Sequence, residues 1–253
     1  MRSKRDKRLI FGLLGRDIGY SLSPALYRSM WQEQGLNHTY RLVDTSEPEE
    51  FLSELRASDQ WGGCNVTIPY KRWIIDHLDE ISPQVKVVGA VNTVVRQDGK
   101  LVGYNTDVDG FRRSLIPLLT SDDRVALVLG SGGAAQSVLY VLNELEISTM
   151  VVSRHPHGAE IAYTALTDQL ISEVALIVNT TPLGSTQYQG ALPSIPYDAI
   201  DGHHLLYDLI YSPMETPFLR EGRARGARTI NGMKMLEEQA KAAWEIYSDK
   251  LGL

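Results

Sequence analysis

A short run of glycines between an apolar segment and a helical segment restricts the fold of this chain more than any other feature. Residues 124–129 read RVALVL, a continuous apolar run of strand length, and the turn of residues 130–133 follows at once. From about Ala134 to Leu145 the pattern becomes helical. A buried strand that turns directly into a helix is the building unit of parallel α/β sheets. We therefore expect an α/β fold.

Strand-length runs alternate with helical patterns along most of the chain, which supports the same fold class. We expect further strands over residues 9–15, 39–43, 63–68, 149–153, 176–179, 205–210 and 228–230. Helices are expected over residues 24–34, from a capping box at Ser46-x-x-Glu49 to about residue 55, and from Met233 to about Lys250. Residues 91–96 and 100–104 flank Gln97-Asp98-Gly99, which predicts a β-hairpin.

The glycine turn has the context that a dinucleotide-binding site requires. Gly130 permits a tight turn, Gly132 allows a pyrophosphate to approach the backbone, and the small Ala135 allows close packing of helix on strand. The N–H groups and the helix dipole at this turn attract phosphate. We therefore predict that the segment from Gly130 to Ala134, including Ser131 and Gly133, binds a dinucleotide. The alternative is a turn selected for packing alone.

The end of the next strand distinguishes NADP from NAD. An NAD site usually places a carboxylate there, about 20 residues after the glycine turn, to bind the ribose hydroxyls. Here the strand ends in Ser153-Arg154. A guanidinium suits the 2′-phosphate of NADP because it is a charged, planar donor. We favour NADP, with NAD use left open, and the alternative is a surface arginine.

Composition excludes several classes of protein. The chain has 253 residues, 43% of them hydrophobic, and a net charge of -6, so nonspecific nucleic-acid binding is not expected. Cys64 is the single cysteine, which fits a reducing compartment and a buried strand position. No apolar run reaches the roughly 18 residues of a membrane helix, and residues 1–8 are expected to form a solvated tail. We therefore expect a cytoplasmic protein. We expect no metal site, because the six histidines are better interpreted as solvated loop residues.

Seven separate segments in order resemble the shikimate dehydrogenase family, and together they cover nearly the whole chain. They are Tyr20-Ser21-Leu22-Ser23-Pro24, Asn65-Val66-Thr67-Ile68-Pro69-Tyr70-Lys71, Gly89-Ala90-Val91-Asn92-Thr93, Asn105-Thr106-Asp107, Asn179-Thr180-Thr181-Pro182-Leu183-Gly184, Tyr207-Asp208-Leu209-Ile210-Tyr211 and Asn231-Gly232-x-x-Met235-Leu236-x-x-Gln239.

The resemblance implies two α/β domains with a cleft between them. Residues 1–107 would form the substrate-binding domain, rejoined by a C-terminal helix over residues 233–253. Residues 108–232 would form a Rossmann-like NADP-binding domain. The family reversibly reduces 3-dehydroshikimate to shikimate with NADPH in the biosynthesis of chorismate and the aromatic amino acids. The resemblance thus implies a small-molecule substrate, no nucleic-acid or membrane partner, and a monomer or homodimer.

The resemblance also assigns site residues. Lys71 and Asp107 match the catalytic pair of the family. A lysine can donate a proton to a carbonyl that becomes an alcohol, and an aspartate can orient the ammonium. Without the flanking motif, Lys71 would be interpreted as a surface charge at a helix start.

Hydroxyl and amide groups suit a substrate that carries a carboxylate and ring hydroxyls. Ser21 and Ser23 match serines that hold the carboxylate, although Ser23 before Pro24 is also a favoured helix cap. The residues that match hydroxyl-binding or nicotinamide-proximal positions are Asn65, Thr67, Asn92, Tyr211 and Gln239. Asn65 and Asn92 could instead be turn residues. Gln239 could lie on a solvated helix face, and Tyr211 could be a core aromatic residue. Ser153, Thr180 and Gly232 join the glycine turn and Arg154 as expected cofactor contacts.

Several positions depart from the family pattern, and two of them bear most on function. Lys234 replaces a usual glycine, with three alternatives: slower hydride transfer, a changed substrate choice, or a side chain that points outward. Gly158 stands where a second basic residue often follows the arginine, which favours weaker phosphate binding or dual NAD/NADP use. Alternatives to a shikimate dehydrogenase are therefore a dehydrogenase for quinate or a related cyclic substrate, and a noncatalytic metabolite-binding homologue.

Overall fold

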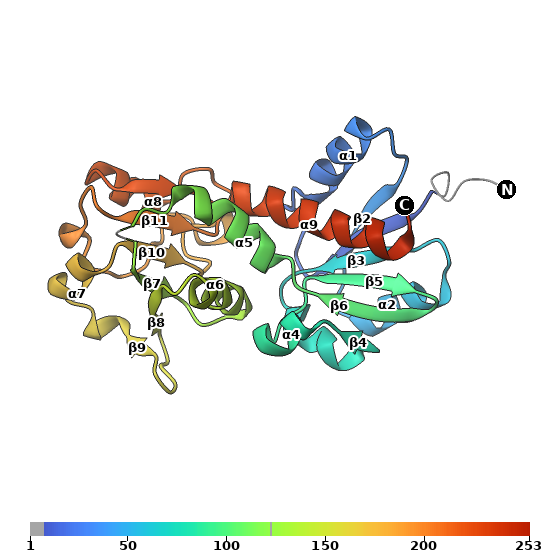
Figure 1. Ribbon diagram of the computed structural model, residues 1–253, viewed down its shortest axis with the longest axis horizontal. Coiled ribbons are helices and arrows are strands. Elements are labelled where there is room, and N and C mark those ends of the chain that lie inside the picture. The colour runs from blue at the N-terminus through green and yellow to red at the C-terminus, as the bar shows by residue number, and fades with distance from the viewer. Residues whose placement is uncertain (1–7, 122) are drawn as a thin grey trace. The chain divides into compact units, whose positions relative to one another are not determined.

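The computed structural model describes residues 8–121 and 123–253 of a chain that divides into two compact units. Unit 1 contains the residues up to Asp109 together with Gln239–Leu253, and unit 2 contains Gly110–Glu238. Both units have α/β architecture (Figure 1). Of the tail expected over residues 1–8, only Arg8 lies within the described residues, where it is exposed and donates a hydrogen bond to Thr39.

Unit 1 contains a mixed six-stranded sheet in the order β2-β1-β3-β5-β6-β4. Strands β2, β1 and β3 are parallel, whereas β5 is antiparallel to both of its neighbours. The strands are β1 (Ile10–Gly15), β2 (Thr39–Asp44), β3 (Gly63–Val66), β4 (Glu80–Ile81), β5 (Thr93–Gln97) and β6 (Lys100–Tyr104). The helices that begin in this unit are α1 (Ser23–Glu33), α2 (Pro48–Ala57), α3 (Tyr70–Trp73), α4 (Pro83–Val88) and α5 (Asp107–Leu115).

Both faces of the unit 1 sheet are buried, because alternate side chains of each strand point to opposite sides. On one face, Leu14 and Cys64 pack with Phe51, Leu52 and other residues of α2. On the other face, Phe11 of β1 packs with aromatic residues of α1 and of α9 (Met233–Leu251). Each fully buried large apolar side chain contributes roughly 1.5–3 kcal/mol relative to exposure. Burial of Cys64 confirms the structural role expected for it.

The predicted hairpin is confirmed as β5 and β6. Arg96 pairs with Leu101 and Gln97 with Lys100, so Asp98 and Gly99 form the two-residue turn. Their φ angles are 50° and 82°, as a two-residue turn with left-handed residues requires. This hairpin places Thr93 at the start of β5 opposite Tyr104 at the end of β6, beside the Asn105-Thr106-Asp107 segment.

Unit 2 contains a parallel six-stranded sheet in the order β12-β11-β10-β7-β8-β9. The strands are β7 (Val125–Leu129), β8 (Ser148–Ser153), β9 (Ile161–Ala162), β10 (Leu176–Asn179), β11 (Leu205–Asp208) and β12 (Arg228–Ile230), and the helices are α6 (Gly133–Glu144), α7 (Asp168–Glu173) and α8 (Pro217–Ala224). The chain runs from β7 to β8 on one side and continues with β10 on the other. The carboxyl end of β7 is therefore a topological switch point, where α/β sheets bind ligands.

Helices cover both faces of the unit 2 sheet. Residues of α7 and α8, including Ile171 and Phe218, pack against Leu127 and Leu206 on one face. On the other face, Ser114 of α5 lies 2.7 Å from the hydroxyl of Tyr207 in β11, and Phe111 makes an edge contact with the same ring. The parallel sheet predicted from the apolar runs is thus confirmed.

Two expected helix caps are wrong. Helix α1 begins at Ser23 itself with Leu22 as its N-cap, and Ser21 Oγ accepts the N–H of Ser23 at 3.2 Å. The capping box of Ser46 and Glu49 does not form, because Glu47 is the N-cap of α2 and its N–H is bonded to Thr45 Oγ1. In both places a hydroxyl two residues upstream binds the N–H instead, which is the local competition expected of serine and threonine.

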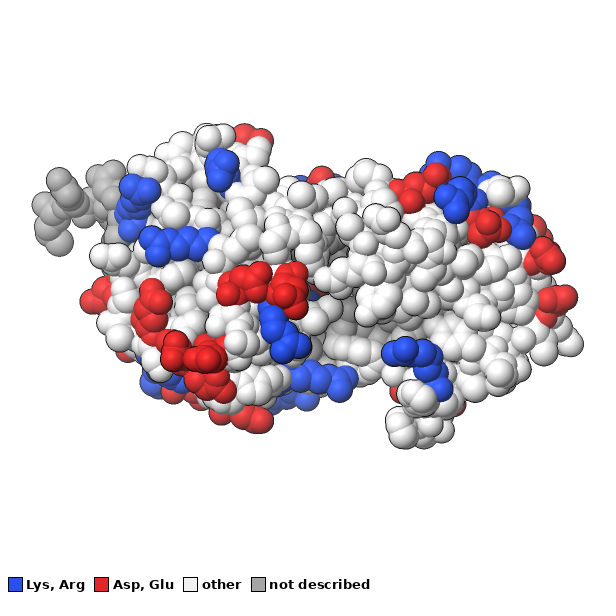
Figure 2. All heavy atoms as spheres, turned by 180° about the vertical axis from the view of Figure 1, so that it is seen from behind, with Lys and Arg blue, Asp and Glu red and all other residues white. Residues whose placement is uncertain are grey.

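The surface carries charges of both signs. On the face in Figure 2, basic and acidic side chains form small interspersed groups around broad uncharged areas. Within residues 8–121 and 123–253, no helix has the length and apolar character needed to cross a membrane.

Candidate active site

An ion pair between Lys71 and Asp107 forms the centre of the candidate site in unit 1. Lys71 Nζ lies 2.6 Å from Asp107 Oδ2, and the two side chains are 19% and 9% exposed. The pair is therefore accessible to a small molecule but largely shielded from water. Residues 36 apart in sequence meet here, as the family resemblance implies for its catalytic pair.

Backbone contacts hold Lys71 in place. It lies on the single turn of α3, which follows β3 after the Ile68-Pro69 segment. The hydroxyl of Tyr70 donates to the carbonyl of Thr45 at 2.7 Å, and the N–H of Val91 donates to the carbonyl of Lys71 at 2.8 Å. These bonds connect the short helix to two other segments of unit 1, so the lysine side chain starts from a fixed backbone.

Asp107 is the first residue of α5, and the side chain of Asn105 holds the backbone around the start of this helix. Asn105 Nδ2 donates to the carbonyl of Ala90, while its Oδ1 accepts the N–H of Val108. An asparagine in this position caps the helix start. The negative carboxylate of Asp107 also lies where the helix dipole stabilises it.

Asn92 connects this pair to other predicted site residues. Its Nδ2 donates to Asp107 Oδ1 at 2.9 Å and lies 3.4 Å from Gln239 Oε1. Its Oδ1 accepts the N–H of Thr106 at 2.7 Å. In this structure Asn92 therefore orients the aspartate from the side opposite Lys71, a role that residue type and spacing alone do not indicate.

A second group of predicted residues extends the same network. Asn65 Oδ1 accepts the hydroxyl of Tyr40 at 2.8 Å, and Asn65 Nδ2 lies 3.2 Å from the carbonyl of Asn92. The hydroxyls of Ser21 and Ser23 are 3.2 Å apart, which confirms that they face the same side. Tyr40 is half-buried, and burial of its hydroxyl raises its pKa well above the ordinary tyrosine value. Tyr40 therefore acts as a neutral hydrogen-bonding group.

Thr67 lies at the carboxyl end of β3, between Asn65 and Lys71. Its N–H donates to the carbonyl of Leu14 at 2.9 Å, and the residue is half-buried. Unit 1 thus brings Lys71, Asp107, Asn92, Asn65 and Gln239 into one hydrogen-bonded network, with Thr67 on the connecting segment.

Three members of this region were not among the predicted site residues: Tyr40, Thr93 and Thr106. Thr93 and Thr106 stand in the quoted motifs beside Asn92 and Asp107, which is the signal that could have identified them.

The arrangement is suited to proton transfer at an oxygen atom. An ammonium that is held by a carboxylate can donate a proton to a developing alkoxide and is replenished from solvent. Amide and hydroxyl groups around it can bind a polyhydroxylated ring.

In unit 2, the glycine turn lies where it was predicted, between β7 and α6. Gly130 has a φ of 106°, and a Cβ there would lie 2.6 Å from Thr180 Oγ1, so only glycine fits. Cβ atoms at Gly132 and Gly133 would extend into open space. Ala135 is fully buried against the sheet. The turn therefore has the close packing and the open backbone that a pyrophosphate site requires.

The other expected cofactor residues of unit 2 gather at the same edge. Leu129 is paired with Val152 in β8 and with Asn179 in β10, so Ser153 and Thr180 lie on either side of the turn. Ser131 Oγ is 3.4 Å from Ser153 Oγ. Arg154 follows directly and is exposed. These positions fit a dinucleotide whose 2′-phosphate would lie near the guanidinium.

Gly232 has a packing reason of its own. A Cβ at this position would lie 2.0 Å from the carbonyl oxygen of Leu209, and the N–H of Gly232 donates to the carbonyl of Ile210. Tyr211 follows in the same segment and is half-buried. The close backbone approach explains why glycine stands at position 232.

Lys234 lies on the same helix as Glu238, and its ammonium is 2.9 Å from that carboxylate. This contact favours an outward-pointing side chain among the three alternatives given for Lys234.

The interpretation of all histidines as solvated is wrong for His204, which is fully buried. Its Nδ1 accepts the N–H of Asp201 and its Nε2 lies 3.0 Å from the carbonyl of Ile171. Asp201, His203 and His204 place potential metal ligands within 4.8 Å of one another. Because both ring nitrogens of His204 already have partners, we interpret the group as a structural connection to α7.

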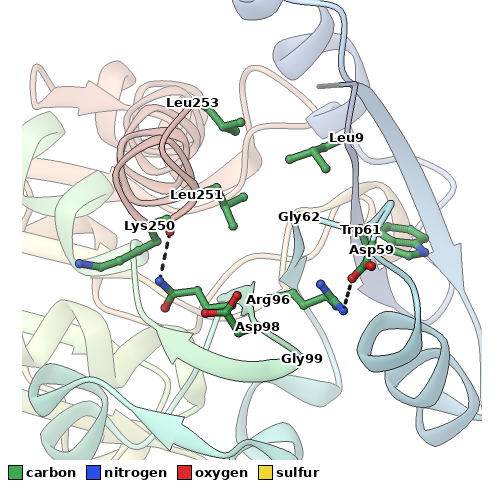
Figure 3. A pocket seen from close by; sticks show the side chains of 11 residues that line it. Leu9, Asp59, Trp61, Gly62, Arg96, Asp98, Gly99, Lys250, Leu251 and Leu253 are labelled. Atoms are coloured by element: carbon green, nitrogen blue, oxygen red, sulfur yellow. Dashed lines mark hydrogen bonds and ion pairs between the residues drawn. The ribbon is translucent and has the colours of Figure 1, made fainter. Parts of the chain in front are cut away.

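A cavity of about 670 Å³ lies elsewhere in unit 1 (Figure 3). Its apolar lining includes Leu9, Leu251 and Leu253. Its charged lining includes Arg96, which is paired with Asp59 at 2.8 Å. The lining residues are distinct from the predicted site residues, so the cavity is separate from the Lys71–Asp107 centre.

Asp208, at the end of β11, is a buried carboxyl group in unit 2. Burial raises its pKa to about 6, although Thr216, the N–H of Ile210 and Asn179 donate hydrogen bonds to it. Well below pH 4, both the folded and the unfolded protein carry the proton. Between about pH 4 and pH 6 the unfolded chain loses it first, so the carboxyl group contributes less stability as pH rises through this window.

We therefore expect the free energy of unfolding of the wild type, relative to Asp208→Asn, to fall by about 2 kcal/mol from pH 4 to pH 7. Urea unfolding of both proteins across this range measures the difference. The asparagine also disturbs hydrogen bonds, but that offset does not depend on pH. A pH-independent difference would contradict the raised pKa.

Comparison with known proteins identifies the family. The model of the shikimate dehydrogenase substrate binding domain matches residues 13–94. Shikimate dehydrogenase (NADP(+)) of Chlorobaculum tepidum is 34% identical, across 97% of this chain and 92% of that protein. The corresponding protein of Shouchella clausii is 35% identical, across 95% and 93%.

Solved structures agree with these sequence relatives. Shikimate 5-dehydrogenase of Thermus thermophilus in complex with NADP(H) and shikimate has a TM-score of 0.86 and 33% identity, across 95% of this chain and 94% of that chain. Quinate dehydrogenase of Corynebacterium glutamicum in complex with NAD has a TM-score of 0.85 and 26% identity, across 96% and 94%. The relatives match almost from end to end and at an identity of about one third, and the chain belongs to the shikimate dehydrogenase family.

Proposed function

We propose that this protein is an NADP-dependent shikimate dehydrogenase that reversibly reduces 3-dehydroshikimate to shikimate, in the route to chorismate. The contact of 2.6 Å between Lys71 and Asp107, inside a network of amides and hydroxyls, carries the proposal. The names of the relatives support the substrate and the cofactor. We assign substrate binding to unit 1 and NADP binding to unit 2.

In the reduction, Lys71 donates a proton to the carbonyl oxygen of the substrate as the ketone becomes an alcohol. Asp107 holds the ammonium and accepts a hydrogen bond from the new hydroxyl. Bound NADPH supplies the hydride. Asn92 keeps the aspartate oriented, and a low-dielectric surrounding strengthens each of these interactions. One ketone, the hydride and one proton from Lys71 thus give one alcohol, and solvent returns the proton to the lysine.

The remaining residues of unit 1 suit the rest of the substrate. The hydroxyls of Ser21 and Ser23 donate to its carboxylate. Asn65, Thr67 and Gln239 bind its ring hydroxyls. In unit 2, the glycine turn holds the pyrophosphate, Arg154 binds the 2′-phosphate, and Tyr211 lies near the nicotinamide.

Steady-state assays with purified protein test the proposal. Shikimate and quinate are each offered with NADP+ and with NAD+, and formation of the reduced nicotinamide is measured. We expect the highest kcat/KM with shikimate and NADP+. Higher kcat/KM with quinate would favour the second candidate, a quinate dehydrogenase, which the similarity to the enzyme of Corynebacterium glutamicum supports. Absence of turnover with all four combinations would reject the proposal.

Replacing Arg154 by alanine tests the choice of cofactor. The exposed guanidinium loses a charged hydrogen bond to the 2′-phosphate, so we expect KM for NADP+ to rise roughly 10- to 100-fold. NAD+ lacks this phosphate, and its KM is expected to stay nearly unchanged. Arg220→Ala, at another exposed arginine of unit 2, is the matched control. Equal changes in KM for NADP+ and NAD+ in Arg154→Ala would show that the guanidinium does not bind the 2′-phosphate.

A further inference from the structure

We propose that Thr93 is a positioning residue of this site, whose buried hydroxyl fixes the orientation of two site amides, Asn65 and Asn92. The inference rests on the proposed function and adds a residue to it. Thr93 begins β5 and is fully buried, so substrate reaches the site without touching it. Its Oγ1 lies 3.1 Å from Asn65 Nδ2 and 3.0 Å from Asn92 Oδ1.

Main-chain partners determine which way each amide faces. Asn92 Oδ1 accepts the N–H of Thr106, which can only donate, so this atom is the amide oxygen. Asn65 Nδ2 donates to the carbonyl of Asn92, which can only accept, so this atom is the amide nitrogen. The two assignments do not depend on Thr93. They direct the amide oxygen of Asn92, which can accept more than one hydrogen bond, and the second N–H of Asn65 toward the same point.

A hydroxyl is the group that satisfies both needs, because it donates one hydrogen bond and accepts others. The proton of Thr93 is donated to Asn92 Oδ1, and its lone pair accepts from Asn65 Nδ2. The neighbouring hydroxyl of Thr106 lies 3.2 Å away and completes the cluster. An amide donor and an amide acceptor are thus connected through a single oxygen atom with no access to solvent.

The connection extends to the acid–base pair. With its oxygen held by Thr93 and Thr106, Asn92 directs its Nδ2 toward Asp107 Oδ1, and Asp107 Oδ2 in turn holds Lys71. On the other side, Asn65 keeps its oxygen toward Tyr40. Loss of the Thr93 hydroxyl would leave one N–H of Asn65 unsatisfied. It would also remove one of the hydrogen bonds to Asn92 Oδ1, whose remaining partners are the N–H and the hydroxyl of Thr106, so both amides would be held less firmly. Buried unpaired groups of this kind are costly, and small displacements of catalytic groups lower rates strongly.

Replacing Thr93 by valine removes the hydroxyl at nearly constant shape, and Thr93→Ala removes it without adding a methyl group. For both variants we expect kcat/KM for shikimate to fall roughly 10- to 100-fold, with a lower kcat and a higher KM for shikimate. KM for NADP+ should change by less than about twofold, because unit 2 binds the cofactor. Thr93→Ser keeps the hydroxyl and should retain kcat/KM to within about threefold of wild type.

Val94→Ala is the matched control for loss of packing. Val94 is the next residue of β5, is fully buried and points to the opposite face of the sheet. We expect this variant to lower the melting temperature while keeping KM for shikimate and kcat close to wild type.

Two outcomes would overturn the inference: full activity of Thr93→Val and Thr93→Ala, or equal losses in Thr93→Ser and Thr93→Val. A loss of activity in Val94→Ala as large as that in Thr93→Val would also overturn it, because the effect would then come from packing. Failure of the proposed function is recognised separately, since the wild type itself would then not turn over shikimate.

Discussion

Replacing Lys71 by alanine is expected to lower kcat/KM for shikimate by roughly a thousandfold, which lies within the usual range for loss of a general acid. The variant removes the proton donor and leaves Asp107, which is 9% exposed, without its cation. KM for NADP+ should stay near the wild-type value, because we propose that unit 2 binds the cofactor. Steady-state kinetics in both directions measure these constants.

Lys71→Arg separates proton transfer from charge. A guanidinium keeps the positive charge beside Asp107 but does not release its proton in proteins. If Lys71 acts by proton transfer, Lys71→Arg should be nearly as inactive as Lys71→Ala. Lys86→Ala, at an exposed lysine of α4, is the control and should behave as wild type. Near-normal turnover by Lys71→Ala would reject the assigned mechanism.

The regular part of the fold could be predicted from the sequence. An apolar run of strand length such as residues 125–129, rich in β-branched residues and followed at once by a glycine turn, favours a strand buried on both faces, and the structure confirms β7 there. The Asp98-Gly99 turn was predicted for the same kind of reason, because few residues accept positive φ angles. These features are local, so a window of ten residues contains the information that determines them.

Short elements were not predicted, because long-range contacts determine them. Helix α3 has a single turn, and Tyr70 holds it by a hydrogen bond to Thr45 rather than by any helical periodicity. Helix α5 begins at Asp107, where the sequence had led us to expect only the division between two domains. A single helical turn such as α3 gains little from helix propensity and depends on tertiary packing.

The burial of single polar residues could not be predicted from the sequence either. His204 lies next to exposed His203, and only the contacts with Asp201 and Ile171 reveal that it is a core residue. The same limit applies to Tyr40, which follows no recognised motif yet lies 2.8 Å from Asn65.

For the candidate site, the motifs indicated residue types but not their connections. Asn92 was expected to bind a substrate hydroxyl, and its position in the structure makes it a partner of Asp107. Both of its amide hydrogens have protein acceptors nearby, among them Asp107, Thr106 and Gln239. A substrate hydroxyl would therefore join this network by sharing or replacing one of these bonds.

Asp107→Asn is expected to lower kcat/KM for shikimate by roughly 100-fold, because the amide cannot satisfy both of its neighbours. One carboxylate oxygen of Asp107 accepts from Asn92 Nδ2, and the other binds Lys71 Nζ. An amide has a single oxygen, so its NH2 group must face either the amide N–H of Asn92 or the ammonium of Lys71. In both orientations two donors meet. The kinetics are compared with Asp98→Asn, the same chemical change at an exposed turn of unit 1, which should leave activity unchanged.

The double variant Lys71→Ala with Asp107→Asn decides whether the two residues act as one unit. If the aspartate works by holding the ammonium, its loss costs little once the lysine is gone, so the double variant should have nearly the kcat/KM of Lys71→Ala alone. Independent contributions would instead multiply, to a fall of roughly 100,000-fold. A multiplicative loss would show that Asp107 contributes through its hydrogen bond to the substrate hydroxyl, independently of the 2.6 Å contact with Lys71.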